Sequence, residues 1–156
     1  MPSCNASVEC VDSGENNPEL SEKQLAFWTA FVEYGKNRDH GDILTRKPLR
    51  ENWYDVSINA HDYHISFTIT RGNAAHILIY TYNTEAFKRL EAKKDDIEAI
   101  CGFKFEWYSS RKGSTQKRII YSRDIDYYSA ARKQECFDWF LDCFDKLKSA
   151  LVACDT

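Results

Sequence analysis

The spacing of the apolar residues changes along this chain, and this change constrains the fold more than any other feature of the sequence. Near the start, apolar residues recur at steps of three and four, which places them on one face of a helix. From Trp53 they alternate with polar residues, as on a strand that buries one face. Helical spacing returns after Asn83 and again after Asp126. A chain that keeps the two periods in separate blocks is expected to fold as an α+β domain.

The predicted elements follow from these blocks. Strands are expected at 53–58, 65–70, 75–82, 103–108 and 118–123, and helices at 21–35, 84–100 and 126–151. Asn83 or Thr84 caps the second helix, and Asp126 or Ser129 opens the last one. The order is α-β-β-β-α-β-β-α. We therefore expect a two-layer α+β domain with a mostly antiparallel five-stranded sheet packed with three helices.

The N-terminal segment 1–20 differs in composition from the rest of the chain. It is rich in Ser, Asn, Glu and Gly and lacks an apolar face, which predicts a flexible leader. Ser21 and Gln24 have the spacing of a capping box, so the first helix is expected to begin at Ser21. The remaining residues, 21–152, are expected to form one domain, since 156 residues are an ordinary length for a single domain.

Composition and cysteine spacing exclude several classes of protein. The chain is 43% hydrophobic and 14% aromatic, which excludes overall disorder. No run of about 18 apolar residues and no signal-peptide pattern is present, so we expect a cytoplasmic protein that does not span a membrane. The six cysteines include no C-x-x-C pair, and those of the last helix are expected to be buried thiols. We predict no metal site and no cofactor.

A basic stretch near the last predicted hairpin is the strongest signal for binding. The net charge is −3, yet residues 104–123 hold six basic residues against one acid, a local net charge of +5. Cations for phosphates and rings for base stacking occur together here, as nucleic-acid contact requires. A solvated hairpin tip has the same composition. The candidate nucleic-acid-binding residues are Arg111, Lys112, Lys117, Arg118, Tyr108 and Tyr121.

A second candidate is a ligand groove beside the middle helix. Lys94 falls within the apolar stripe of that helix, with Glu98 one turn further on. The two form either an exposed surface pair or an ion pair that lines a groove. His76 shares one face of the third strand with Tyr80 and Tyr82, and this face either meets a ligand or is covered by a helix. The candidate groove residues are Lys94, Glu98, Trp107 and His76.

Motifs of known enzymes are absent from the sequence. No glycine-rich phosphate loop or nucleophile elbow occurs, and no predicted strand carries an acidic pair two residues apart followed by Lys. His61 and His64 are interpreted as polar residues of the turn between the first two strands. Asp55 and Glu106 lie on predicted strands that could be neighbours, so a divalent-metal nuclease that uses Asp55 or Glu106 with Lys94 stays an alternative. No residue is assigned as catalytic.

Several aromatic and helical motifs resemble those of a known family. They are Phe27-Trp28 followed by Phe31 and Tyr34, Trp53-Tyr54, the middle-helix pattern from Phe87 to Glu98, and Phe105-Glu106-Trp107. From about Gln24 to Leu151 the chain resembles the bacterial and archaeal family called domain of unknown function 4268. Its members often lie C-terminal to a restriction-endonuclease-like domain. This resemblance implies an accessory role in DNA metabolism or defence, and 20 leader residues are too few to supply the nuclease domain.

These observations favour a non-enzymatic binding or interaction module over an enzyme. The expected partner is nucleic acid or a nuclease protein, and no association with a membrane is expected. Besides the metal nuclease, a homodimeric structural subunit that buries the surplus of Trp and Tyr is the remaining alternative. A cleft that holds two acids and a lysine would favour the nuclease, and a large apolar interface would favour the dimer.

Overall fold

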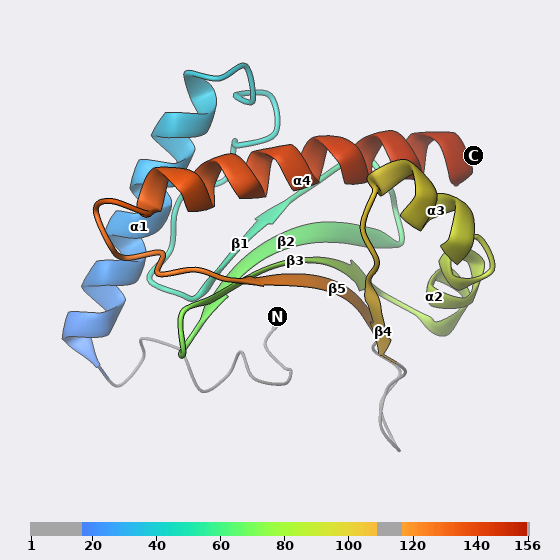
Figure 1. Cartoon of the computed structure of the whole chain (residues 1–156), viewed down its shortest axis with the longest axis horizontal. Helices are drawn as coiled ribbons and strands as arrows, with labels where there is room; N and C mark the ends of the chain where they lie inside the picture. The colour runs from blue at the N-terminus through green and yellow to red at the C-terminus, as the bar shows by residue number, and fades with distance from the viewer. Residues whose placement is uncertain (1–16, 109–116, 156) are drawn as a thin grey trace.

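Helices lie along one side of an antiparallel five-stranded sheet in the computed structural model, which describes residues 17–108 and 117–155 (Figure 1). The helices are α1 (Pro18–Lys36), α2 (Thr84–Glu91), α3 (Lys94–Cys101) and α4 (Lys133–Cys154). The strands are β1 (Trp53–Val56), β2 (Tyr63–Thr70), β3 (Ala74–Thr81), β4 (Glu106–Tyr108) and β5 (Lys117–Asp124). The predicted α+β class is confirmed, with four described helices where three were expected. None of these helices combines the length and apolar character of a membrane span.

The sheet has the order β1-β2-β3-β5-β4, and every pair of neighbours is antiparallel. The meander of β1, β2 and β3 forms as predicted. After β3 the chain passes through α2 and α3 to the edge strand β4, and β5 then returns between β4 and β3. β3 is therefore the central strand, and it pairs along its whole length with both β2 and β5.

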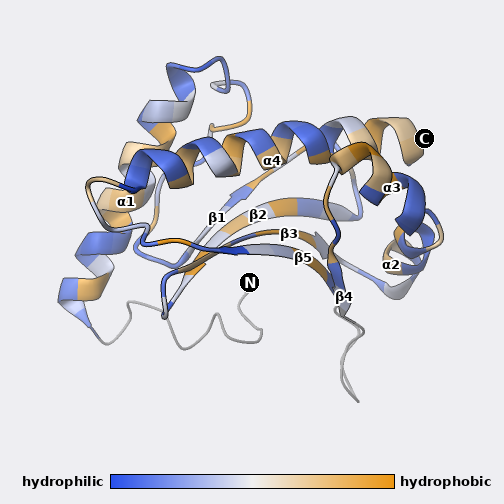
Figure 2. Ribbon diagram, viewed as in Figure 1, coloured by the Kyte–Doolittle hydropathy of each residue, from blue (hydrophilic) through white to orange (hydrophobic). Residues whose placement is uncertain are grey.

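The core lies between the sheet and the helices, and aromatic rings fill its centre. Trp28 and Phe31 of α1, Phe67 of β2 and Phe140 of α4 have at most a trace of exposed surface. The ring of Phe140 lies 5.0 Å from that of Phe67 and 5.4 Å from that of Phe31. Hydrophobic and hydrophilic residues recur along α4 in bands, as expected of a helix that buries one face (Figure 2). This packing fixes the sheet to α1 and α4.

The middle helix predicted at 84–100 is two helices. α2 ends at Glu91, and α3 begins at Lys94 with two aspartates in its first turn. In one continuous helix, the apolar stripe that contains Leu90 and Ile97 would also include Lys94. The break leaves Lys94 exposed while Leu90 and Ile97 are both fully buried. The cost of burying a charged amine explains why the helix divides here.

The first helix begins three residues before the predicted start. Asn17 is its N-cap, and the Asn17 side chain accepts a hydrogen bond from the backbone N–H of Leu20 at 3.0 Å. Pro18 occupies the first turn, where its missing N–H costs nothing. Ser21 does not cap the helix, because its hydroxyl donates to the Pro18 carbonyl. The capping-box prediction is therefore wrong, and residues 18–20 of the predicted leader are helical.

The last helix begins at Lys133 rather than at Asp126 or Ser129. The preceding segment is tied to the turn between β2 and β3, where the Tyr127 hydroxyl donates to the Thr70 carbonyl at 2.6 Å. Its backbone then turns at Ser129, whose carbonyl accepts from the N–H of Lys133 at 2.8 Å. The chain thus crosses from the sheet to the helix layer before α4 can begin.

Candidate functional site on the polar face of the sheet

The face of the sheet opposite the helices carries most of the side chains that suit ligand binding. Along β3, Ala75, Ile77 and Ile79 belong to the core, and the alternate residues lie on the opposite face. No described helix covers this second face (Figure 1), although Leu78, Tyr80 and the hydroxyl residues Ser66, Thr68 and Thr70 on it are buried. We call it the polar face, and its residues on β2, β3 and β5 are His64, Ser66, Thr68, Thr70, His76, Leu78, Tyr80, Arg118, Ile120, Ser122 and Asp124.

One row of residues crosses the polar face from strand to strand. His64 of β2 pairs with Tyr80 of β3, and Tyr80 pairs with Arg118 of β5. On the other side of Arg118, Tyr108 holds the register position on β4. Directly opposite residues in antiparallel strands have their Cβ atoms about 4.5–5.5 Å apart. The fold therefore brings an imidazole, a phenol and a guanidinium into one lateral row, and it places two candidate nucleic-acid-binding residues, Tyr108 and Arg118, in that row.

His64 is the centre of a small aromatic cluster. Its ring stacks on Tyr80 with centroids 5.3 Å apart, and its Nδ1 lies 2.8 Å from the hydroxyl oxygen of Tyr82. Its Nε2 lies 3.4 Å from Asp55 Oδ1 of β1. Burial, followed by the charge of Asp55, raises the pKa of Tyr82. Tyr82 therefore keeps its proton at neutral pH. Its hydroxyl shares a hydrogen bond with His64 Nδ1, while Nε2 of the same ring faces Asp55.

A second histidine joins three strands of the same face. His76 Nε2 lies 2.8 Å from the Thr70 hydroxyl, and His76 Nδ1 lies 2.7 Å from the Ser122 hydroxyl. Burial lowers the pKa of His76, although the charges of Glu106 and Asp124 partly oppose this effect. The imidazole is therefore neutral at pH 7, and its two hydrogen bonds hold β2, β3 and β5 together.

The proposed ligand groove beside the middle helix is not one continuous site. Glu98 Oε2 accepts hydrogen bonds from the Phe105 backbone N–H at 2.8 Å and from the Trp107 indole N–H at 2.9 Å. No ion pair joins Lys94 to Glu98 within the described residues, and the Lys94 amine instead lies 6.0 Å from the centre of the Trp107 ring. Lys94, Glu98 and Trp107 thus meet where α3 joins β4, while His76 lies on the polar face. Glu98 acts there as an anchor for β4.

The candidate nucleic-acid-binding residues are also divided between the two faces. Tyr121 lies on the helix side of β5, where its ring stacks on Phe103 with centroids 3.9 Å apart and planes 10° apart. It therefore does not share a face with Arg118. Lys117 begins β5 opposite Thr81. Arg111 and Lys112 lie outside the described residues.

The two strand carboxylates considered for a metal nuclease cannot share a metal ion. Asp55 lies on β1 and Glu106 on β4, at opposite edges of the sheet. Four strand spacings separate them, about 19 Å. The alternative in which these two strands are neighbours is therefore excluded. In the part of the chain that the structure describes, no group of three or more His, Cys, Asp or Glu residues is arranged to hold a metal ion.

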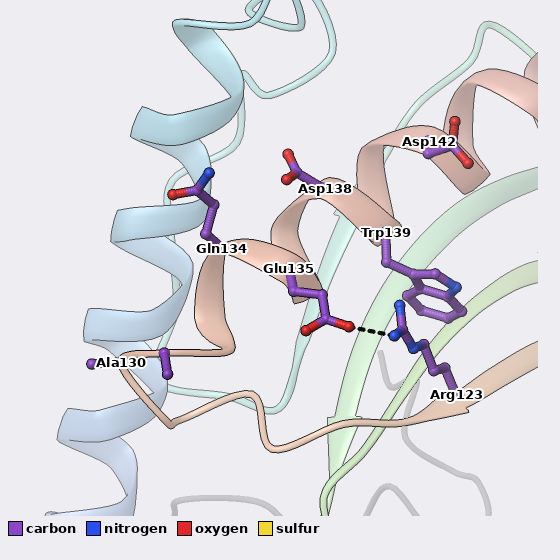
Figure 3. A pocket seen from close by; sticks show the side chains of 8 residues that line it. Arg123, Ala130, Gln134, Glu135, Asp138, Trp139 and Asp142 are labelled. Carbon is purple, nitrogen blue, oxygen red and sulfur yellow. Dashed lines mark hydrogen bonds and ion pairs between the residues drawn. The ribbon is translucent and has the colours of Figure 1, made fainter.

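A pocket of about 790 Å³ opens beside α4 and the end of β5 (Figure 3). In Figure 3, Arg123 of β5 and Glu135 of α4 point toward one another and form an ion pair. The other acids that line this pocket also have partners. Asp138 accepts a hydrogen bond from the Tyr34 hydroxyl of α1, and Asp142 forms an ion pair with Lys146 at 3.0 Å. The contacts of Glu135 and Asp138 therefore join α4 to β5 and α1, while that of Asp142 lies within α4.

Sequence reasoning missed His64 as part of the site because it placed this residue in a turn. The structure has His61 in the β1–β2 connection and His64 as the second residue of β2. The signal was present, because extending the alternation of β2 back by one residue puts His64 on the same face as Thr68 and Thr70. The partner of His64 on β1, Asp55, was considered only as a metal ligand.

Comparison with known proteins gives a family for the chain. The family model described as domain of unknown function (DUF4268) matches residues 23–154. No curated protein and no solved structure matches the chain. The match covers α1 from Lys23 onward, the five described strands and the other described helices. It agrees with the resemblance carried by the aromatic motifs, and the chain belongs to the DUF4268 family.

Proposed function

We propose that this chain is a non-enzymatic binding module and that its polar face binds single-stranded nucleic acid. The observation that carries the proposal is the row of His64, Tyr80 and Arg118 across three neighbouring strands, with Tyr82 beside it. Unpaired bases stack on aromatic rings and on guanidinium planes, and an antiparallel sheet presents such groups at regular spacing. Tyr82 is 48% exposed, so its ring is the first stacking surface that a base would meet.

The charges of the polar face indicate how a strand would be held. Among the described residues of β2, β3 and β5 on the polar face, Arg118 is the one arginine or lysine. Three acids, Asp55, Glu106 and Asp124, lie on this face or beside it. The sequence holds further basic residues between Tyr108 and Arg118, and we expect most of the attraction for phosphate to come from them. With two or three phosphate contacts, log Kd is expected to change with log salt by a slope of about 1.5–2 in magnitude.

The test is fluorescence anisotropy with a labelled, unstructured oligonucleotide of DNA or RNA. Measurements start at about 50 mM salt, where screening is weak. Tyr82→Ala removes the exposed ring and should weaken binding about tenfold, since stacking contributes about 1–3 kcal/mol per base. Arg118→Gln should weaken binding and lower the salt dependence by about one phosphate contact.

Matched controls carry the same changes on the helix side of the molecule. Tyr34→Ala alters a tyrosine of α1 that contacts Asp138, and Arg132→Gln alters an exposed arginine next to α4. Both variants should bind as the unaltered protein does. No binding at tens of micromolar protein, or equal losses from the control and test variants, would refute the proposal.

The module would act as an accessory to an enzyme in DNA metabolism or defence, as the family resemblance implies. We also propose that it is cytoplasmic. Four described cysteines are free, three of them buried, which suits a reducing compartment. The homodimer stays a prediction, and sedimentation of the free and oligonucleotide-bound protein would test it.

A further inference from the structure

A pocket of about 380 Å³ lies where the β1–β2 connection meets α2 and the C-terminal end of α4. None of the residues that line it belongs to the row of His64, Tyr80 and Arg118 on the polar face. Apolar side chains and ionisable groups both line it. Its lining includes Ile58, Leu151, Val152, His61, Lys148, Arg89, Asp62, Tyr63 and Asp155.

The Asp155 carboxylate is held in this pocket as a bound anion would be. Its Oδ1 accepts from Arg89 Nε at 2.7 Å, and its Oδ2 accepts from Arg89 Nη2 at 3.3 Å and from the Tyr63 hydroxyl at 2.7 Å. The Nε and Nη2 edge of an arginine matches the spacing of two oxygens in a carboxylate or a phosphate. Three donors therefore converge on one oxyanion.

Asp62 fixes the orientation of the arginine. Its carboxylate accepts from Arg89 Nη1 at 2.8 Å and from Nη2 at 3.0 Å, which uses the end of the guanidinium and leaves the Nε edge for Asp155. Asp62 is itself anchored, because its backbone carbonyl accepts from the Tyr82 N–H at 3.0 Å. The anion-binding edge of Arg89 is thus organised by a group that would stay in place if Asp155 moved away.

The remaining ionisable side chains of the pocket are basic. Lys148 and His61 line it, and neither forms an ion pair within the described residues. The Lys93 amine donates to the carbonyl of Cys154, next to Asp155. With Asp155 in place, its charge and that of Asp62 balance Arg89 and Lys148. Without Asp155 the pocket would hold a net positive charge.

We infer that this pocket is a binding site for a phosphate monoester and that Asp155 occupies it as an internal competitor. A phosphate monoester offers three oxygens and nearly two charges, so it can bind Arg89, Tyr63 and Lys148 together, which one carboxylate cannot do. The apolar side chains of Ile58 and Leu151 leave room for the organic group. The volume lies within the range of small-molecule sites, about 300–1,000 Å³.

The primary experiment is calorimetric titration of the full chain with inorganic phosphate. Asp155→Asn removes the competing charge and keeps the shape of the side chain. Because an internal competitor acts at an effective concentration on the order of millimolar or above, this variant should bind phosphate about tenfold more tightly than the unaltered protein. The control is Asp145→Asn, the same change at an exposed position of α4 that pairs with His40. Asp145→Asn should leave phosphate binding unchanged.

Two further comparisons separate this site from general attraction of anions. Adding Arg89→Lys to Asp155→Asn removes the fork of donors but keeps the charge, and it should abolish the gain in phosphate affinity. A nucleoside 5′-monophosphate should bind Asp155→Asn more tightly than phosphate does, and the nucleoside alone should not bind. Oligonucleotides with and without a 5′-phosphate then show whether the monoester is a free small molecule or a strand end.

The inference is overturned if Asp155→Asn binds phosphate no more tightly than Asp145→Asn, or if the gain survives Arg89→Lys. If Asp155→Asn does not fold, NMR of the unaltered protein tests whether phosphate binds at Arg89. Phosphate should shift the Arg89 Nε–H resonance in a saturable manner, and an unchanged resonance at about 100 mM phosphate would refute the site. The polar-face proposal is tested separately, by the binding of unphosphorylated oligonucleotides to the unaltered protein and to Tyr82→Ala. The phosphate site and the polar-face site can therefore each be refuted without the other.

Discussion

Phe140→Ala should be among the most destabilising single substitutions in this protein. The Phe140 side chain has no exposed surface, and it lies 5.0 Å from the ring of Phe67, 5.4 Å from that of Phe31 and 6.0 Å from that of Trp28. These neighbours belong to α1 and β2 and are themselves packed on other rings, so they cannot move to fill the space. The expected loss is therefore at the upper end for a buried phenylalanine, about 3–5 kcal/mol. That is a large share of the roughly 5–15 kcal/mol by which domains are stable.

Chemical denaturation followed by tryptophan fluorescence measures this loss. Phe140→Ala should lower the denaturation midpoint at an unchanged slope, and it should lower the melting temperature by on the order of 10 °C. Phe140→Leu keeps most of the volume and should cost less than about half as much. Val152→Ala, at a position of the same helix that is 63% exposed, is the control and should change stability by no more than about 0.5 kcal/mol. An unchanged midpoint for Phe140→Ala would show that α4 does not pack on the sheet as described.

Three more predictions concern individual contacts. Glu98→Ala leaves two N–H donors of the β4 segment without their acceptor and should cost about 2–3 kcal/mol in urea denaturation, whereas Glu98→Gln should cost less; equal stability of all three proteins would contradict this. The hydrogen bond from Arg89, opposed by burial, holds the pKa of Asp62 below its ordinary value, so this contribution to stability is complete above about pH 4 and is lost as the pH falls further. Melting temperatures between pH 6 and pH 2.5 should show that loss, and Arg89→Gln should reduce it. Burial raises the pKa of the Cys136 thiol to about 12, so mass spectrometry should find it unmodified by iodoacetamide at pH 8 until the protein is unfolded.

The strands of this fold are predictable from local patterns because one sheet face is packed and the other is mostly polar. Phe67 and Ile69 alternate with Ser66 and Thr68, and this spacing alone places β2 to within two residues. Helix ends are less predictable, since they depend on caps and on tertiary contacts. Lys94 is the clearest example. Its place in an otherwise apolar stripe was visible, but the structure avoids burying it by breaking the helix.

The candidate site depends on contacts between residues far apart in the sequence. That Tyr80 lies opposite Arg118 follows from the insertion of β5 between β3 and β4, and no local pattern specifies which strand borders β3. Tyr121 illustrates the reverse case, since alternation along β5 separates it from Arg118 even though both lie in one basic stretch. The contact of Arg89 with Asp155 spans 66 positions and was likewise invisible in the sequence.

Titration of isotope-labelled protein with a short single-stranded oligonucleotide tests the central claim most directly. Backbone amide shifts report which surface the strand touches. The proposal predicts saturable shifts concentrated at His64, Tyr80, Tyr82 and Arg118, with α1 and the exposed side of α4 unaffected. Shifts confined to the helix side, or an unchanged spectrum at about 50 mM salt and millimolar oligonucleotide, would contradict the claim that the polar face is the binding surface.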